Sequence, residues 1–546
     1  MPAPQALPPS WRDDAVAAGI ITLLLIPQSL AYALLAGLPA ELGLAASIVP
    51  ALAYAAVGTS PVSVMGPGAV LSLMTAQALQ HALAVAPEGT SAAALAGVLA
   101  LETGAVLLLG AALRFDALVA LLSVPVLHGF MTGAALTIVI TQLPVLAGSS
   151  SGGTRLVDVA AGWLGAARPG HLLTLGITVA AITLLWLGRR AGGQAGRAAP
   201  LAVMALAIAG AALADASGHG VAVVGALPAL AIRPTWPALD PALWRLMLPS
   251  AALLALLVSV EHLAVAGSLA ARRRQHLVPR RELCGLGGAN LLAALSGGMP
   301  VGGGLSRSAV AFEANARSLR VGVIVAGLMA LSALLLAAPL ALLPRAVLAA
   351  TIVLAASSML DLQPFRLAWR YAREEFWVML GVAALTVLAS MEVALSVGVA
   401  LSAALLLQRT ADPHVARIGR VPGTEHYRNI ERHATEEQPG VVALRIDESL
   451  LFTNARDLGS LVQDQLDEDT RRVVLQMSPV NAIDFSGLTA LLALDEALHA
   501  RGVRLDLAEV KGPLMDRLKT ADWAARAHGR VFLSMHQALQ PDADPR

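Results

Sequence analysis

Charge is scarce in this chain: Asp, Glu, Lys and Arg make up only 14% of its 546 residues, against about 25% in soluble proteins. Hydrophobic residues account for 56%. This composition indicates that most of the chain lies in lipid. The net charge of +1 gives no basis for nucleic-acid binding, so we expect no nucleic-acid partner.

Cysteine is almost absent, since Cys284 is the only one. A single cysteine excludes an intrachain disulfide and a cysteine metal cluster. The twelve histidines show no H-E-x-x-H motif and no paired metal-binding spacing. We therefore expect no metal site. We also expect no cofactor and no catalytic residues.

Basic residues are spread unevenly, with 22 of the 38 in the first 410 positions and 16 in the last 136. The chain therefore divides into a polar N-terminal segment (1–11), a membrane part (12–410) and a soluble domain (415–540). The opening "MPAPQALPPSWRDD" is polar and rich in proline, so it does not read as a cleavable signal peptide.

Apolar stretches approach or exceed the length of about 20 residues that crosses a bilayer core of about 30 Å. Several are too long for one span or are broken by proline and glycine, so we expect more than ten helices. The stretches run at 15–36, 42–57, 92–112, 117–147, 172–188, 199–215, 247–270, 321–343, 346–360 and 376–407.

Two short segments are interrupted by glycine and proline: "TSPVSVMGPGAVLSLMTA" from Thr59 and "GGMPVGGGLSRSAV" from Gly297. Neither reads as a normal span, because such breaks free backbone groups that lipid cannot satisfy. The two also resemble each other: "LAYAAVGTSPV" and "LLAALSGGMPV" share Leu, Ala, Gly, Pro and Val in register. The chain therefore reads as two repeats, about 12–220 and 245–410, which pair Gln28 with Glu261. Matching breaks in two halves point to the binding site of a transporter.

Arginine placement predicts the orientation, because positive residues favour the cytoplasmic side. Seven spans per repeat, with both termini in the cytoplasm, place most arginines on one side. The cytoplasmic groups are Arg189, Arg190 and Arg197; Arg272, Arg273, Arg274, Arg280 and Arg281; and Arg366, Arg370 and Arg373, whereas Arg155, Arg168, Arg233, Arg245 and Arg345 fall opposite.

The second break has the features of an anion site. A helix that starts near Ser306 presents unpaired N–H groups and the positive end of its dipole, and Arg307 adds a planar donor fork. "MGPGAV" offers a second helix start, with Pro67 suited to its first turn. The alternative is that the glycines are packing joints between helices. Arg307 favours a site, because arginine at membrane depth costs about 2.5–3.5 kcal/mol on insertion scales.

Glu261 lies deep in an apolar span and is the candidate for proton coupling. Burial favours the protonated form of a carboxylate and a nearby arginine favours the charged form, so such a group can exchange a proton. The alternative is a static salt bridge with Arg307. Glu102 is a second membrane carboxylate and a rival proton carrier, and Tyr32 lies one helical turn after Gln28.

The tail from 415 to 540 alternates strand patterns such as "GVVALRID" with helical patterns such as "SGLTALLALDEALHARG", which predicts a small α/β domain. In "NAIDFSGLTALLAL" a strand closes and a helix opens. Ser486 in that turn suits a helix N-cap, and the alternative is a phosphorylation site.

These segments resemble the sulfate permease (SulP) family over nearly the whole chain. The similar stretches include "IPQSLAYALLAGLPAELGLAASIVPALAYAAVGTSPVSVMGPGAVLSL", "PVLHGFMTGAALTIV" and "GGLSRSAVAFEANAR", and "IDFSGLTALL" is similar to the signature of the sulfate transporter and anti-sigma factor antagonist (STAS) domain. "LSRSAV" is closest to the sulfate-transporting branch.

The resemblance implies 14 transmembrane segments as two inverted seven-segment repeats, forming core and gate domains, and a cytoplasmic STAS domain. It implies elevator-type, proton-coupled sulfate uptake by a homodimer in the cell membrane, with a further partner possible at the STAS domain. The alternatives are bicarbonate, chloride or dicarboxylate transport, or an anion channel. The implied anion site comprises Gln28, Tyr32, Gly68, Ala69, Ser306 and Arg307, and Glu261 is the implied proton-coupling acid. Two departures are Glu102, where the family usually has an apolar or aromatic residue, and the lack of hydroxyls in "MGPGAV".

Overall fold

The computed structural model describes residues 10–87, 89–114, 122–149, 171–227 and 240–540, together with Val159 and Trp236. It divides into two compact units, Met1–Ser402 and Ala403–Arg546, and each is described by itself. Arg155, Arg168 and Arg233, on which part of the orientation prediction rests, lie outside the described residues. So does nearly all of the predicted segment 1–11.

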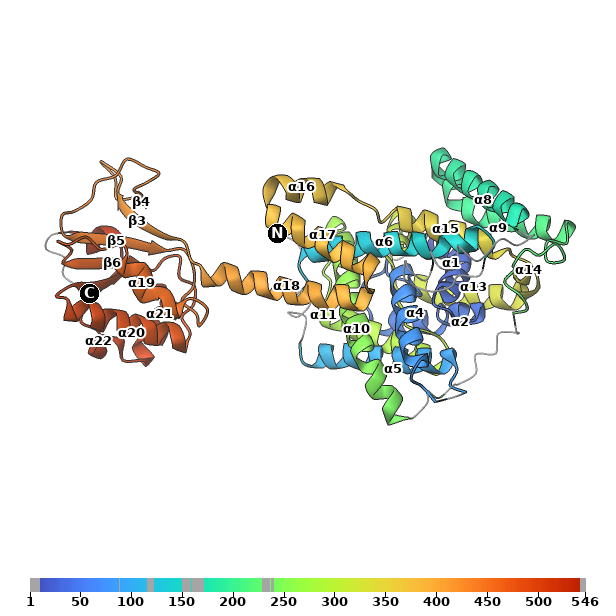
Figure 1. Cartoon of the computed structure of the whole chain (residues 1–546), viewed down its shortest axis with the longest axis horizontal. Coiled ribbons are helices and arrows are strands. Elements are labelled where there is room, and N and C mark those ends of the chain that lie inside the picture. Colours follow the sequence, from blue (N-terminus) through green and yellow to red (C-terminus); the bar gives the residue numbers. More distant parts are fainter. Residues whose placement is uncertain are drawn as a thin grey trace. The chain divides into compact units, whose positions relative to one another are not determined.

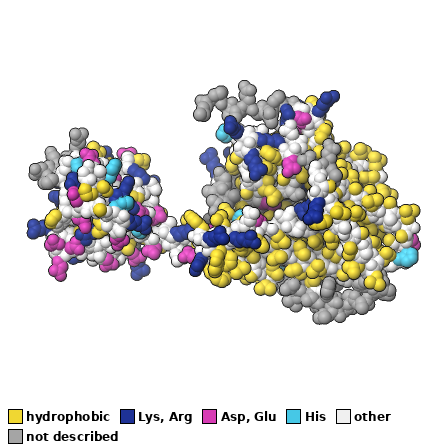
Figure 2. Space-filling model, turned by 90° about the horizontal axis from the view of Figure 1, so that it is seen from above, with side chains coloured by type: hydrophobic (Ala, Val, Ile, Leu, Met, Phe, Trp, Pro, Cys, Tyr) yellow, Lys and Arg dark blue, Asp and Glu magenta, His cyan; other side chains and the backbone are white. Residues whose placement is uncertain are grey.

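The first unit is helical (Figure 1), as its apolar composition requires in lipid, where helices satisfy their own backbone groups. Figure 2 shows the broad hydrophobic surface of this unit and the mixed charges on the second. Its helices are α1 (Trp11–Leu35), α2 (Ala40–Ala45), α3 (Val49–Val57), α4 (Ala69–Leu83), α5 (Ala92–Ala112), α6 (Val124–Leu146), α8 (His171–Ala191), α9 (Gly193–Leu213), α10 (Pro241–Arg272), α11 (Pro279–Leu295), α12 (Leu305–Glu313), α13 (Arg320–Leu335), α14 (Ala337–Ala341), α15 (Arg345–Ser357), α16 (Gln363–Tyr371), α17 (Arg373–Leu388) and α18 (Met391–Ala411), which continues into the second unit.

Seven helical segments in the described part are long and apolar enough to cross a membrane. Three shorter apolar helices, at 198–213, 320–335 and 345–357, add to them. The chain is therefore a polytopic helical membrane protein. The count of 14 segments stays a prediction.

Both interrupted segments break their helices, as predicted. The first leaves α3, forms the two-residue strand β1 (Met65–Gly66) and enters α4. The second leaves α11, forms β2 (Gly302–Gly303) and enters α12. The two strands pair antiparallel, with Met65 opposite Gly303 and Gly66 opposite Gly302. The two repeats therefore meet strand to strand at their breaks.

Glycines allow close packing at several places in this unit. A Cβ at Gly104 of α5 would lie 2.8 Å from the carbonyl oxygen of Gly287 on α11. At the second break, a Cβ at Gly302 would lie 2.9 Å from Leu71, and one at Gly303 would collide with the ring of His262. The glycines of the break are thus packing positions as well, although they pack against side chains from the opposite break and from α10.

The second unit is an α/β domain, as the tail pattern predicts. Its six-stranded sheet has the order β4-β3-β5-β6-β7-β8, with β5 to β8 parallel and β3 antiparallel to both neighbours. Helices α19 to α22 cover one face (Figure 1). The elements are β3 (Val415–Arg420), β4 (Tyr427–Asn429), β5 (Val441–Ile446), η2 (Ala455–Asp457), α19 (Leu458–Gln463), β6 (Arg472–Gln476), α20 (Phe485–Ala500), β7 (Arg504–Ala508), α21 (Gly512–Thr520), α22 (Trp523–Arg526), β8 (Val531–Phe532) and α23 (Met535–Ala538).

Ser486 is not the N-cap of its helix, so that prediction is wrong. Asp484 caps α20, and its carboxylate accepts from the backbone N–H of Gly487 and that of Phe452. A carboxylate two residues before the serine competes for the same cap, and it also carries a charge that suits the positive end of the helix. Ser486 is the second helical residue and its side chain is exposed.

Candidate functional site

A cavity of about 300 Å³ lies where the two breaks meet in the first unit. All six residues predicted for the anion site line it, and so does Glu261. They come from four helices and two repeats. The predicted residues are Gln28 and Tyr32 on α1, Gly68 and Ala69 at the start of α4, Glu261 on α10, and Ser306 and Arg307 on α12.

Two helices begin at the cavity wall. Gly68 is the N-cap of α4 and Gly304 that of α12, and the first backbone bonds run from Ser72 to Gly68 and from Ser308 to Gly304. The N–H groups of the residues between cap and first bond have no partner within the helix. Pro67 precedes the cap, so its predicted place in the first turn is wrong. Two sets of N–H donors and two positive dipole ends therefore flank one cavity.

Arg307 joins the two breaks. Its side chain is 2% exposed, and its guanidinium donates to four carbonyl oxygens. Three belong to the first break, namely Val64 at 3.4 Å, Gly66 at 3.0 Å and Pro67 at 2.6 Å, and the fourth is that of Gly302 at 3.0 Å. The planar fork of arginine suits such a set of acceptors. The charge of Arg307 thus stays at the cavity wall, while its N–H donors hold the paired strands β1 and β2 together.

Glu261 and Gln28, which the sequence pairs between the two repeats, both line the same cavity. No ion pair among the described residues joins Glu261 to Arg307, so the predicted alternative of a static salt bridge is wrong. The two lie within electrostatic range of each other and of Tyr32. The Oε1 atom of Gln28 is buried without a hydrogen-bond partner among the described residues, so this oxygen is not committed to another group.

A buried carboxylate that the sequence did not reveal holds the approach to the first break. Glu282, on the first turn of α11, is fully buried. It accepts from Tyr54 Oη at 2.5 Å, from the backbone N–H of Thr59 at 2.7 Å and from the Thr59 hydroxyl, and it lies 2.6 Å from His262 Nε2. A carboxylate so fully satisfied fixes all of its partners. Glu282 therefore fastens the segment before β1 to α10 and α11.

Asn290 holds the second break in a similar way. Its side chain is fully buried in α11, accepts from the backbone N–H of Val301 at 2.9 Å and donates to the Val301 carbonyl at 3.0 Å. These two hydrogen bonds to one residue orient the chain just before β2. The signal was a single amide in the apolar run "LCGLGGANLLAAL", a residue type that needs a partner in lipid.

Glu102 does not line the cavity. It is 4% exposed on α5, and its Oε2 atom has no hydrogen-bond partner among the described residues. That oxygen of Glu102 is thus not committed to another group among the described residues. Glu102 therefore stays a rival proton carrier, at a distance from the anion cavity.

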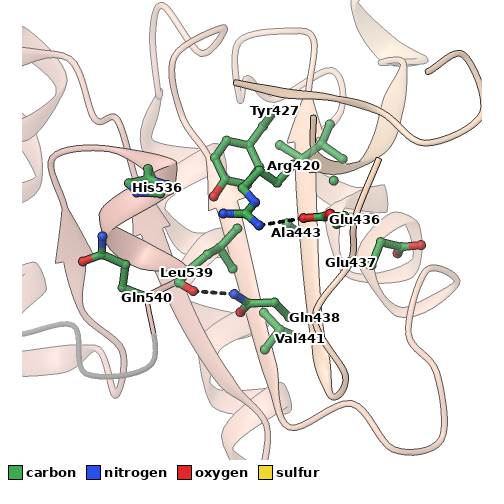
Figure 3. A pocket seen from close by; sticks show the side chains of 12 residues that line it. Arg420, Tyr427, Glu436, Glu437, Gln438, Val441, Ala443, His536, Leu539 and Gln540 are labelled. Atoms are coloured by element: carbon green, nitrogen blue, oxygen red, sulfur yellow. Dashed lines mark hydrogen bonds and ion pairs between the residues drawn. The ribbon is translucent and has the colours of Figure 1, made fainter. Parts of the chain in front are cut away.

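A larger pocket, of about 470 Å³, lies in the second unit between β3, β5 and α23 (Figure 3). Arg420 donates to Glu436 at 2.6 Å, and Gln438 donates to the carbonyl oxygen of Leu539 at 2.6 Å. Its lining carries two carboxylates, of Glu436 and Glu437, against one arginine. That balance does not favour an anion, so the smaller cavity is the better candidate for the transport site.

Comparison with known proteins gives a family for both units. The sequence model of the sulfate permease family matches residues 12–382, and that of the STAS domain matches residues 432–538. The Mycobacterium tuberculosis protein named "Probable sulfate transporter MT1781" is 31% identical over 539 residues, which cover 97% of this chain and 95% of that protein. "Sulfate transporter 4.1, chloroplastic" of Arabidopsis thaliana is 30% identical over 524 residues, 91% of this chain and 75% of that one.

Solved structures share the fold. Murine Solute Carrier 26 family member A9, an anion transporter in the inward-facing state, matches with a TM-score of 0.86 and 22% identity over 97% of this chain and 91% of that one. The transmembrane domain of a cyanobacterium bicarbonate transporter matches with a TM-score of 0.62 and 20% identity, over 70% of this chain and 97% of that one. At these identities the likeness concerns the fold.

Proposed function

This chain belongs to the sulfate permease family and carries a STAS domain, and we propose that it takes up sulfate together with protons. Its family and the proteins it resembles are transporters, so the prediction that it is not an enzyme is confirmed. The observation that carries the proposal is one cavity with two helix N-termini, Arg307 and the carboxylate of Glu261 on its wall.

Sulfate is the substrate that this wall favours. The dianion has four oxygens that accept hydrogen bonds, and the two helix starts, the Ser306 hydroxyl and the Gln28 amide supply donors around it. Arg307, which is bonded to the carbonyl oxygens of Pro67 and Gly302 beside the paired strands, contributes positive charge. The relatives named as sulfate transporters support this choice over bicarbonate, chloride and dicarboxylates.

Glu261 is proposed as the proton-coupling group. When ionised, it repels a dianion in the same cavity, and when protonated it removes that repulsion and can donate a hydrogen bond. Sulfate and the proton then favour each other's binding, which is the reciprocal coupling that a symporter needs. The inward proton gradient thereby drives sulfate accumulation.

The proposed movement is of the elevator type. The helices that carry both breaks move as one core against the gate helices and expose the cavity to each side in turn. The bonds of Arg307, Glu282 and Asn290 suit this motion, because they hold both breaks on a common scaffold. We further propose a homodimer in the cell membrane, with both termini and the STAS domain in the cytoplasm.

The test is uptake of radiolabelled sulfate into proteoliposomes with and without an imposed pH gradient, acidic outside. We expect saturable uptake that exceeds equilibrium only when the gradient is present and is inhibited by selenate. Inhibition of uptake by bicarbonate or fumarate but not by selenate would show that the substrate is not sulfate. A large ohmic anion current would show that the protein is a channel. The variant Glu102→Gln separates the two carboxylates, since it should keep the response to the gradient.

A further inference from the structure

Helix α16 is a short amphipathic helix that joins α15 to α17 at the edge of the first unit (Figure 1). None of its nine residues is buried. Its sequence, QPFRLAWRY, separates by helical position into an apolar arc and a basic stripe. Arg366 and Arg370, four residues apart, share the stripe.

One edge of the apolar arc packs on the next helix. The ring of Trp369 lies 4.9 Å from that of Phe376 and 6.4 Å from that of Trp377, and Phe365 lies 6.4 Å from Phe376. The guanidinium of Arg373 lies 5.2 Å from the Trp369 ring. These aromatic contacts set the orientation of α16 against the start of α17.

The rest of the apolar arc is not covered by any part of the chain that the structure describes. Leu367 is 68% exposed and Tyr371, on the same face, is 86% exposed. The next helix, α17, begins with three charged residues, Arg373, Glu374 and Glu375, and is apolar after them. This change of polarity places its start, beside α16, at the edge of the bilayer core. An amphipathic helix with aromatic and basic residues at that depth lies in the interface, with its apolar face toward acyl chains.

Charge decides which lipid is preferred. Asp361 precedes α16 and its carboxylate accepts from the backbone N–H of Gln363, while Glu374 and Glu375 follow Arg373 on the first turn of α17. These acids lie at the two ends of the segment and offset the charge there. Arg366 and Arg370 stand between them on one exposed stripe, which makes a local positive site.

We propose that α16 lies in the headgroup layer of the cytoplasmic leaflet and that Arg366 and Arg370 bind the phosphates of anionic phospholipids. The position matters for transport, because α16 begins four residues after Met359, which lines the anion cavity together with Ala355 and Ser358. Lipid bound at α16 thus holds the cavity wall that α15 provides.

The experiment uses the full chain in lipid vesicles, with an environment-sensitive fluorophore at position 367, introduced by Leu367→Cys in a Cys284→Ser background. Brominated phosphatidylglycerol and brominated phosphatidylcholine are compared as quenchers at equal mole fraction. We expect both to quench and phosphatidylglycerol to quench more. Each arginine near an anionic surface gives a roughly fivefold preference, so Arg366→Gln with Arg370→Gln should lower the preference at least about fivefold.

The matched control is Arg189→Gln with Arg190→Gln, which removes two arginines from the last turn of α8 and should leave the preference at position 367 unchanged. Equal quenching by both lipids in the protein that keeps Arg366 and Arg370 would overturn the proposal. A fluorophore that is shielded from water but not quenched by either lipid would instead mean that a second protein surface covers α16. Because the readout is lipid contact, it does not depend on which anion is carried.

Discussion

The two breaks have the same backbone and different charges. Each passes from a helix into a two-residue strand and then into a second helix whose N-cap is a glycine. Counting from that cap, Leu71 in the first repeat stands where Arg307 stands in the second. Ser72 and Ser308 share the next position, and the hydroxyls of both are buried without a partner among the described residues.

The difference assigns separate tasks to the repeats. Arg307 and Glu261 both belong to the second repeat. The first repeat has Leu71 at the place that matches Arg307, and Gln28 at the place that the sequence pairs with Glu261. The first repeat supplies carbonyl oxygens that bind Arg307. Its Leu71 packs so closely against Gly302 that a side chain at position 302 would not fit. The features that the two repeats share thus form the backbone of the cavity, and the residues that differ between them supply its ionisable groups.

Making the second repeat like the first, by Arg307→Leu, should have the largest effect. It leaves four carbonyl oxygens around an apolar side chain, and each buried acceptor that loses its partner costs about 1–3 kcal/mol. We expect a large fall in the unfolding temperature in detergent and no sulfate uptake. Arg307→Lys should recover part of the stability, because it keeps the charge and loses the fork. Wild-type uptake by Arg307→Leu would refute the role given to this residue.

Loosening only the second break, by Asn290→Leu, should have the next largest effect. The leucine fits the space but leaves the N–H and carbonyl of Val301 without their partner, at a cost of about 1–3 kcal/mol. Thermal unfolding should report this loss, and the KM for sulfate should rise. A conservative control is Asn290→Gln, whose amide restores part of the contact. An unchanged KM with lower stability would mean that Asn290 contributes to folding but not to sulfate binding.

Moving the carboxylate between repeats tests the asymmetry of proton coupling. Glu261→Gln should abolish gradient-driven accumulation of sulfate while downhill sulfate exchange continues. Adding Gln28→Glu to that variant returns an acid to the same cavity from the other repeat. If the cavity alone determines coupling, part of the response to the pH gradient returns. Full accumulation by Glu261→Gln alone would contradict the coupling role.

Removing the Ser306 hydroxyl should have the smallest effect. Ser306→Ala loses one hydrogen bond to the anion, about 0.5–1.5 kcal/mol, which raises the KM for sulfate roughly two- to tenfold. The matched change in the first repeat, Val70→Ser, places a hydroxyl at the position equivalent to Ser306. It should lower KM or leave it unchanged. A rise in KM as large as for Ser306→Ala would mean that packing, not hydrogen bonding, sets the affinity.

The sequence predicted the cavity well because glycine and proline disrupt helices locally, so both breaks and both helix starts are visible as letters. It did not predict what Arg307 binds, since three of its four carbonyl partners lie some 240 positions earlier in the chain. Glu282 was missed for a similar reason. Beside Arg280 and Arg281 it looks like a residue at the membrane surface, and only tertiary packing brings Tyr54, Thr59 and His262 around it.

In the second unit, the order of strands and helices followed from periodicity, whereas the cap of α20 did not. Asp484 and Ser486 both suit an N-cap, and the choice depends on where the strand before them ends its pairing. Asp484 is held by the backbone of Phe452 from another loop, which fixes it at the cap. Competition between two suitable residues was therefore decided by a contact distant in sequence.

The central claim is that both repeats form one sulfate site, and alkylation protection tests it directly. In a Cys284→Ser background, Gln28→Cys and Ser306→Cys each place a single thiol on opposite repeats facing the same cavity. The prediction is that sulfate slows alkylation at both positions with the same half-maximal concentration, while a thiol at Leu367 is unaffected. Protection of one position only, or of neither, would contradict a shared site.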